Sequence, residues 1–361
     1  MWEGCSKIED MCLFWDVPTA DCDSIVNISL RPVHSSGGES VSAASMPSSS
    51  SNEITPATIN DTPESVLQFE RALRKAEHAK KAGKDLSASD LKIIYKDDHI
   101  IVVTKPPGVL TVPGLHSRAS ILTLIHDLFG NSNTSMDRMI VHRLDMDTSG
   151  LVLFGLNAQI TKALHAQFRD RIVQKEYECL VVGHFPAGEY LLDIPLQRDH
   201  QHPPFMRVST PASEQEAGAV LRDLQAHSEK RKNWKHPQPK PSRTRIRVIE
   251  HGLFHDKLPY TRLRLEPITG RTHQLRVHCA ALGFPIVGDP TYGLYGEAAS
   301  GGGIDGLLVW NGPERPDVVL QQEFLKEYRP NDNPMCLHAA FLQIQHPITG
   351  ESMSWNVPPD F

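Results

Sequence analysis

Residues 141–150 read Val-His-Arg-Leu-Asp-Met-Asp-Thr-Ser-Gly and run directly into an apolar stretch, Leu151–Leu156. Strand-like apolar stretches therefore flank a polar loop that carries two carboxylates, an arginine and a histidine. Loops held between rigid strands are frequent sites of catalysis. The second carboxylate, Asp147, is best explained as a turn residue that caps backbone amides. Asp145 is then the candidate catalytic group.

A second polar segment, residues 267–278, reads Pro-Ile-Thr-Gly-Arg-Thr-His-Gln-Leu-Arg-Val-His. It predicts a strand that turns at Thr269-Gly270 and a helix over 272–282, with an apolar stripe of Leu275, Cys279 and Leu282. Arg276 lies beside this stripe, at the boundary of the core. An arginine in that position needs a carboxylate, and its partner is either a structural acid or Asp145.

The remaining pattern predicts an α+β fold with a largely antiparallel mixed sheet, because strands outnumber helices and do not alternate with them. The strands are expected at 92–95, 99–104, 151–156, 177–182, 244–249, 261–265 and 337–344. The other helices are expected at 120–129 and 159–169. Two stretches, about 198–243 and 293–334, are predicted to be irregular.

Composition divides the 361 residues into three parts. Residues 1–60 carry a net charge of −6, which is that of the whole chain, and nine of the residues 35–51 are serine. Such a leader is expected to be disordered. Residues 61–90 are expected to form a basic helical segment, and residues 91–361 the catalytic domain. The body is neutral overall, so its charge does not argue against a polyanionic partner.

Several classes of protein are excluded or disfavoured. No apolar run reaches the ~18 residues that a membrane span needs. The six cysteines show no CxxC spacing, so a disulfide scaffold or a structural zinc site is disfavoured. No metal site is expected.

At this point the chain resembles the RluA family of pseudouridine synthases from about residue 93 to its end. The segments that carry the resemblance are Val103–Gly108 with Val112–Gly114, His142–Gly150, Phe168-Arg169 with Lys175–Tyr177, Ile194–Leu196, Thr269–His278, Gly288-Asp289 with Tyr292, and Leu337–Ala339 with His346-Pro347. The resemblance implies the pseudouridine synthase fold. It also implies an enzyme that breaks the N1 glycosidic bond of a uridine in RNA, rotates the uracil and rejoins it through C5.

The resemblance also implies roles for single residues. Asp145 is the nucleophile or base, Arg276 pairs with it, and Tyr177 stacks on the target base and moves a proton. Arg143 fills the gap that the flipped nucleotide leaves, and Leu337 packs around the aspartate. The remaining substrate-binding residues that the matched motifs suggest are His142, Arg271 and His273.

The chemistry requires no cofactor, because uracil leaves as a delocalised anion. The expected partner is RNA, with the uridine in a loop rather than a duplex, since an unpaired base is the least costly to extrude. Between tRNA and rRNA, tRNA is preferred because the chain resembles the most compact RluA members. We expect a monomer that does not bind membranes and acts in the cytoplasm; a nuclear or organellar location stays open. The basic segment 222–247, which contains Trp234, is either a contact for the RNA backbone or a solvated insertion.

Two other functions compete with this one. The first is a non-catalytic RNA-binding or RNA-folding module on the same fold. The joint presence of Asp145, Tyr177 and Arg276 weighs against it, since binding a polyanion needs no buried carboxylate. The second is a glycosidase that uses Asp145 and Asp147. It is weak, because carboxylates two residues apart on one loop need not flank a bond at the ~5–10 Å required.

Overall fold

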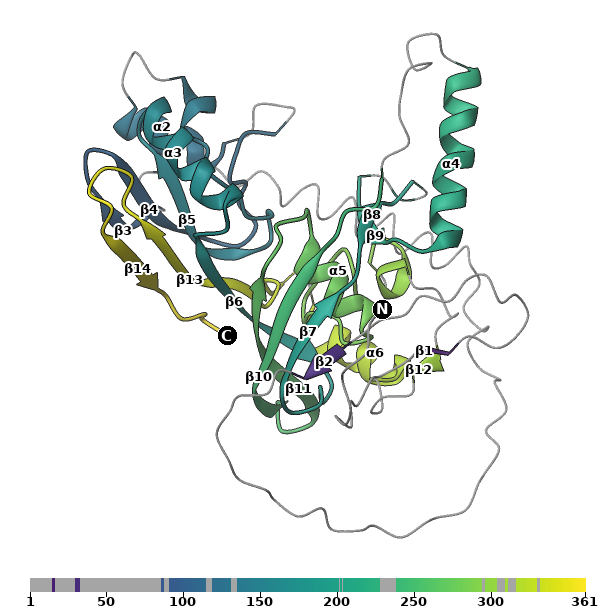
Figure 1. Ribbon diagram of the computed structural model, residues 1–361. Coiled ribbons are helices and arrows are strands. Elements are labelled where there is room, and N and C mark those ends of the chain that lie inside the picture. Colours follow the sequence, from purple (N-terminus) through teal and green to yellow (C-terminus); the bar gives the residue numbers. More distant parts are fainter. Residues whose placement is uncertain are drawn as a thin grey trace, which may run out of the picture.

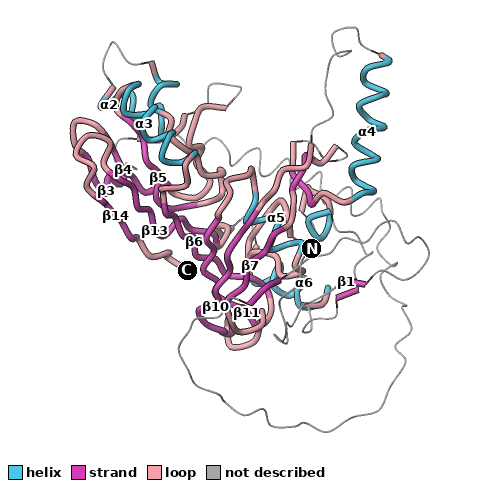
Figure 2. The backbone as a smooth tube through the Cα atoms, viewed as in Figure 1, coloured by secondary structure: helices cyan, strands magenta, loops and turns pink. Residues whose placement is uncertain are grey.

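The fold is that of a computed structural model (Figures 1 and 2). The structure describes residues 15–16, 30–32, 86–87, 91–114, 119–130, 135–200, 202, 204–227, 238–293, 296–303, 309–310, 316–329 and 332–361. Residues 61–85, for which a basic helix is predicted, lie outside this set, as does most of the leader.

One mixed sheet organises the described part of the chain. Its strand order is β2-β7-β10-β11-β6-β13-β5-β4-β3, and β14 pairs with β13 beside this path. The strands are β2 (Leu30–Pro32), β3 (Lys92–Lys96), β4 (Ile100–Lys105), β5 (Ser149–Gly155), β6 (Gln174–Val182), β7 (Glu189–Asp193), β10 (Arg243–Phe254), β11 (Leu258–Pro267), β13 (Leu337–Gln345) and β14 (Ser352–Asn356). All pairings in this sheet are antiparallel except that of β13 with β5. The prediction of an α+β fold with a largely antiparallel sheet is therefore confirmed.

The middle strands β6 and β13 separate two groups of elements (Figure 1). On one side, β3, β4 and β5 carry the helices α2 (Ile121–Phe129) and α3 (Ala158–Arg169). Both helices begin where the sequence predicts, because Ser120 and Asn157 each accept a hydrogen bond from the backbone three residues on. On the other side, β7, β10 and β11 lie near α5 (Gln274–Ala281).

Helix α5 is buried along its whole length. The short stripe predicted from Leu275 and Cys279 is thus only part of its contact surface, since polar residues of the same helix, Gln274, Arg276 and His278, are buried as well. Buried polar groups need partners. His278 has two, the Thr244 hydroxyl at 2.9 Å and the Ile194 carbonyl at 3.2 Å. These bonds tie α5 to β10 and to the residue that follows β7.

The two stretches predicted to be irregular contain regular structure, so that prediction is wrong in part. Residues 198–243 include β9 (Met206–Val208), which pairs with β8 (Leu196–Arg198), and the long helix α4 (Pro211–Ala226). Thr210 forms a capping box with Ser213, and Pro211 occupies the first turn, where a missing N–H costs nothing. Helix α4 projects from the body (Figure 1), and its apolar residues are spread around the helix rather than gathered on one face, which hid it from a search for periodicity.

Residues 293–334 likewise contain a short 3-10 helix, η4 (Ser300–Gly303), strand β12 (Val309–Trp310) and helix α6 (Val318–Glu327).

The leader also contributes two short strands. Strand β1 (Trp15–Asp16) pairs with β12, and β2 pairs with β7. These pairings differ from the expectation that residues 1–60 are disordered throughout. No helix in the described ranges is both long enough and apolar enough to cross a membrane.

Candidate active site

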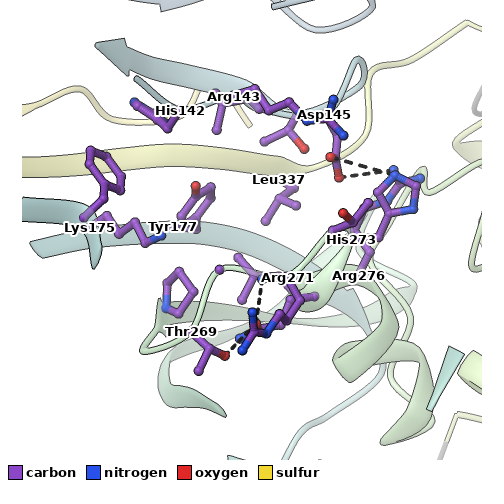
Figure 3. Close-up of a pocket in the computed structure, with 18 residues that line it drawn as sticks. His142, Arg143, Asp145, Lys175, Tyr177, Thr269, Arg271, His273, Arg276 and Leu337 are labelled. Atoms are coloured by element: carbon purple, nitrogen blue, oxygen red, sulfur yellow. Dashed lines mark hydrogen bonds and ion pairs between the residues drawn. The ribbon is translucent and has the colours of Figure 1, made fainter. Parts of the chain in front are cut away.

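A pocket of about 320 Å³ opens between the two groups of elements. It is lined by all eight residues that the sequence analysis assigned to the site: His142, Arg143, Asp145, Tyr177, Arg271, His273, Arg276 and Leu337. They come from the loop before β5, from β6, from the β11–α5 connection, from α5 and from the start of β13 (Figure 3). The volume lies within the ~300–1,000 Å³ of typical ligand pockets.

The loop that presents Asp145 is fixed by hydrogen bonds from another part of the chain. The fully buried Lys105 donates from Nζ to the carbonyls of Pro106, Val109 and Met146 at 2.8–2.9 Å. The Thr111 hydroxyl donates to the Leu144 carbonyl at 2.8 Å and accepts from its N–H at 3.1 Å. The backbone on both sides of Asp145 is therefore tied to the residues that follow β4.

Gly150 lets this loop approach β13. It has a φ of +110°, and a Cβ there would collide with the backbone of Ala339. No other residue fits such a position without displacing the strand. The glycine at the end of the Asp145 motif thus sets the distance between the catalytic loop and β13, which begins with Leu337.

Arg276 reaches the pocket from α5 and is held by a second acid. Its Nε and Nη2 bind the two oxygens of Asp289 at 2.8 and 2.7 Å, and both side chains are almost completely buried. Asp289 also accepts from the backbone of Thr291 and Tyr292. Burial alone would lower the pKa of Arg276, but the charge of Asp289 outweighs it and raises that pKa. The guanidinium is therefore a fixed positive charge.

The remaining nitrogen of Arg276 faces Asp145. Nη1 lies 3.6 Å from Oδ2 of Asp145, whose side chain is 25% exposed (Figure 3). The sequence analysis left two possible partners for Arg276, and the structure contains both. The structural acid Asp289 binds it tightly, and Asp145 lies farther away. A carboxylate held loosely is free to approach a substrate without losing its neighbouring positive charge.

His273 contacts the other oxygen of Asp145, with Nε2 3.8 Å from Oδ1. Its Nδ1 lies 2.8 Å from the Tyr292 hydroxyl, which accepts from the Met206 N–H. The hydroxyl can then direct its own proton to Nδ1, so that Nε2 carries the imidazole proton toward Asp145. Burial lowers the pKa of His273, so the ring is neutral near pH 7.

Tyr177 and Leu337 form the apolar part of the pocket wall (Figure 3). Burial, with a smaller contribution from the charge of Asp145, raises the pKa of Tyr177. Its hydroxyl therefore stays protonated at any physiological pH. Leu337 is 3% exposed, and an apolar neighbour of this kind strengthens electrostatic interactions beside it.

The other predicted residues differ in how available they are. His142 lines the pocket, but its Nε2 accepts from the Leu153 N–H at 3.0 Å and its ring stacks on Phe168. Burial lowers the pKa of His142 to about 3, so it is a neutral structural ring. Arg143 is exposed at the pocket rim, and Arg271 donates from Nε to the Pro241 carbonyl at 3.2 Å.

Reasoning from the residues alone missed three parts of the site: Lys105, Asp289 and Tyr292. All three stand inside segments that carried the family resemblance, Val103–Gly108 and Gly288-Asp289 with Tyr292. Their roles depend on contacts between distant elements, which spacing does not reveal.

The described part of the basic segment 222–247 is largely neutralised. Arg243 pairs with Asp193 at 2.7 Å, Arg245 with Glu266 at 2.6 Å, and Arg247 with Glu189 at 3.3 Å. Residues 228–237, with Trp234, lie outside the described ranges. Among the residues that are described, no cluster of three or more His, Cys, Asp or Glu is placed to hold a metal ion.

The model of the RNA pseudouridylate synthase family matches residues 99–281. The dual-specificity RNA pseudouridine synthase RluA of Escherichia coli K12 is 33% identical over 273 residues, which cover 75% of this chain and 94% of that protein. The ribosomal large subunit pseudouridine synthase D of the same organism is 31% identical over 297 residues, 82% of this chain and 75% of that protein.

A solved structure, human RNA pseudouridylate synthase domain containing 1, matches the fold with a TM-score of 0.51 and 26% identity. The match covers 77% of this chain and 87% of that one. Fold, motifs and sequence identity agree, and the chain belongs to the RluA family of RNA pseudouridine synthases, which are isomerases.

Proposed function

We propose that this chain converts uridine to pseudouridine in a structured RNA, with Asp145 as the catalytic residue and Arg276 and Tyr177 as its partners. One observation carries the assignment: Asp145 lies 3.6 Å from a buried, fixed guanidinium on the wall of a nucleoside-sized pocket that has an aromatic and an aliphatic side. A purely RNA-binding module has no need of this arrangement, because a carboxylate beside a polyanion weakens binding.

The reaction conserves all atoms of the nucleotide. The N1–C1′ bond breaks, the uracil rotates, a C5–C1′ bond forms, and the proton lost from C5 is balanced by one gained at N1. Asp145 acts as nucleophile or as base toward the nucleotide, and Arg276 stabilises its negative charge before and after that step. Tyr177 stacks on the uracil, and because its hydroxyl stays protonated it can donate a hydrogen bond to the base.

The base must leave the stack to reach Asp145. Extrusion costs about a few kcal/mol, least for an unpaired base, and stacking on Tyr177 returns ~1–3 kcal/mol. Arg143, exposed at the rim, occupies the space that the extruded base leaves. We therefore place the target uridine in a loop rather than in a duplex.

The class of RNA follows from the relatives by analogy. One is named for the large ribosomal subunit and another as dual-specificity; the latter matches along 94% of its length, and we favour a tRNA target over an rRNA one. We also propose that residues 91–361 form the catalytic domain, and that the enzyme acts as a monomer in the cytoplasm. The three described cysteines are free and buried, as suits a reducing compartment.

Release of tritium from RNA labelled at C5 of uridine tests the activity directly. The wild-type chain is expected to release label from a tRNA or rRNA fraction. Asp145→Asn should lower release at least ~10³-fold and still bind the same RNA in a filter assay. Release that persists in the variant would refute the role of Asp145. Binding without release by the wild type, from every RNA fraction, would favour the non-catalytic module.

A further inference from the structure

The active-site pocket continues into an open groove of about 750 Å³. The groove shares Phe168, Lys175 and Arg271 with the pocket, and it extends past Arg171 at the end of α3. A substrate strand whose base enters the pocket must leave its own backbone somewhere along the rim. This groove is directly connected to the pocket, so its charges bear on where that backbone lies.

Lys175 stands at the junction of pocket and groove. It lies two residues before Tyr177 on β6, so both side chains point to the same face of the sheet (Figure 3). Its Nζ lies 5.7 Å from the centre of the Phe168 ring and makes no ion pair or hydrogen bond with another described residue. Burial lowers its pKa, which reflects how poorly this amine is solvated.

Two further cations of the groove have no carboxylate partner within the described ranges. Arg171 is exposed, in a left-handed backbone conformation with φ of 60°, where α3 passes into β6. The Arg271 side chain forms one hydrogen bond within the described ranges, from Nε to the Pro241 carbonyl, and its terminal nitrogens have no partner there.

The two acids that line the groove are already neutralised. Glu266 pairs with Arg245 at 2.6 Å, and Glu176 pairs with Arg264 at 3.5 Å. The groove therefore has a local excess of three positive charges beside the pocket, even though the chain as a whole is acidic.

From this geometry we infer that Lys175, Arg171 and Arg271 form a subsite for a phosphodiester group next to the target uridine. The inference rests on the proposed function. A largely buried amine without an anion destabilises the free protein, and three cations that line one groove match a phosphate better than a single uracil carbonyl, which one donor satisfies. The subsite would hold the strand while the base is turned into the pocket.

The test uses a labelled RNA hairpin whose loop holds one uridine among adenosines, with either flanking phosphate replaced by an uncharged methylphosphonate. Affinity is measured in the Asp145→Asn background, so that the probe is not turned over. One of the two replacements should weaken binding about tenfold, as expected for loss of a charged hydrogen bond. That replacement should make little further difference in Lys175→Met, because the partner cation is already gone.

Two further readouts separate a phosphate contact from a structural role. Lys175→Met should lower the slope of log affinity against log salt by about 0.7, and it should raise the KM of the otherwise wild-type enzyme more than it lowers kcat. The same substitution should raise the thermal midpoint of the free protein by about 2 °C. Lys175→Arg should retain the phosphate dependence. Lys162→Met, on the exposed face of α3, is the matched control and should change none of these quantities.

Three results would overturn the subsite. The first is a wild-type affinity that neither methylphosphonate changes, and the second is a loss of kcat in Lys175→Met without a loss of affinity. The third is a lower thermal midpoint in that variant. The second result would assign Lys175 to the uracil. Failure of the subsite is distinct from failure of the proposed function, which only persistent or absent tritium release decides.

Discussion

Two sets of cations, one on the strands β10 and β11 and the other around the pocket, differ in one respect. The arginines of β10 and β11 form a ladder with acids: Arg243 with Asp193, Arg245 with Glu266, Arg247 with Glu189, Arg262 with Glu250, and Arg264 with Glu178. The cations around the pocket, Arg143, Lys175, Arg171 and Arg271, have no such partner among the residues described. Position along the sequence therefore does not separate the cations that pair with acids from those that we propose to bind substrate. The presence or absence of a neighbouring acid in the folded structure does.

Arg276 falls between the two sets. It is paired as tightly as any residue of the ladder, through Asp289, yet one nitrogen remains for Asp145. A buried pair of this kind does not by itself favour stability over an apolar core. It holds a positive charge at a fixed place beside Asp145.

The largest effect is expected when this pair is broken. Asp289→Ala leaves the Arg276 cation buried without its partner, and the free energy of unfolding should fall by about 3–5 kcal/mol, measured by urea denaturation. Replacing both residues, as Asp289→Leu with Arg276→Met, should recover most of that stability but no tritium release. A double variant that turns over RNA would show that the guanidinium is dispensable, and the distinction between Arg276 and the ladder would disappear.

A smaller effect is expected from a matched pair of arginines, one from each set. Arg143→Gln should slow turnover of a folded RNA about tenfold, since stacking beside an extruded base is worth ~1–3 kcal/mol. Arg247→Gln removes a partly exposed ion pair with Glu189, away from the pocket and the groove, so stability should change by less than ~1 kcal/mol and turnover should not change. Equal effects of the two substitutions on turnover would contradict the division into structural and substrate-binding cations.

The smallest effect is a dependence on pH. The pKa of His273 is lowered, so the ring is neutral at pH 7 and gains a proton only below its ordinary value of 6.5. The resulting imidazolium would pair with Asp145 and compete with the substrate. We expect kcat/KM to be level near pH 7 and to fall as the pH drops below 6.5. In His273→Asn, which cannot titrate, the fall should begin at lower pH. Superimposable pH profiles would show that His273 does not act on Asp145.

Much of the fold and of the site could be predicted from the sequence. The strands 92–95, 99–104, 151–156 and 337–344 lie within one or two residues of their observed bounds, because alternating or continuous apolar runs directly reflect burial in a sheet. All eight predicted site residues line one pocket, because the motifs that contain them are short and rigid. Helix α4 escaped prediction, since a helix that projects into solvent needs no apolar stripe.

The sequence by itself determined the family, the type of sheet and the carboxylate that we propose as the catalytic group, because each depends on short runs of neighbouring residues. Tertiary structure alone decided which charges are satisfied. Asp289 stands 13 residues from Arg276 along the chain and binds it at 2.7 Å, whereas Lys175 ends up beside a ring and without an anion. The physical reason is that electrostatic interactions depend on distance in space and on burial, and both are set only when separate strands and helices come together.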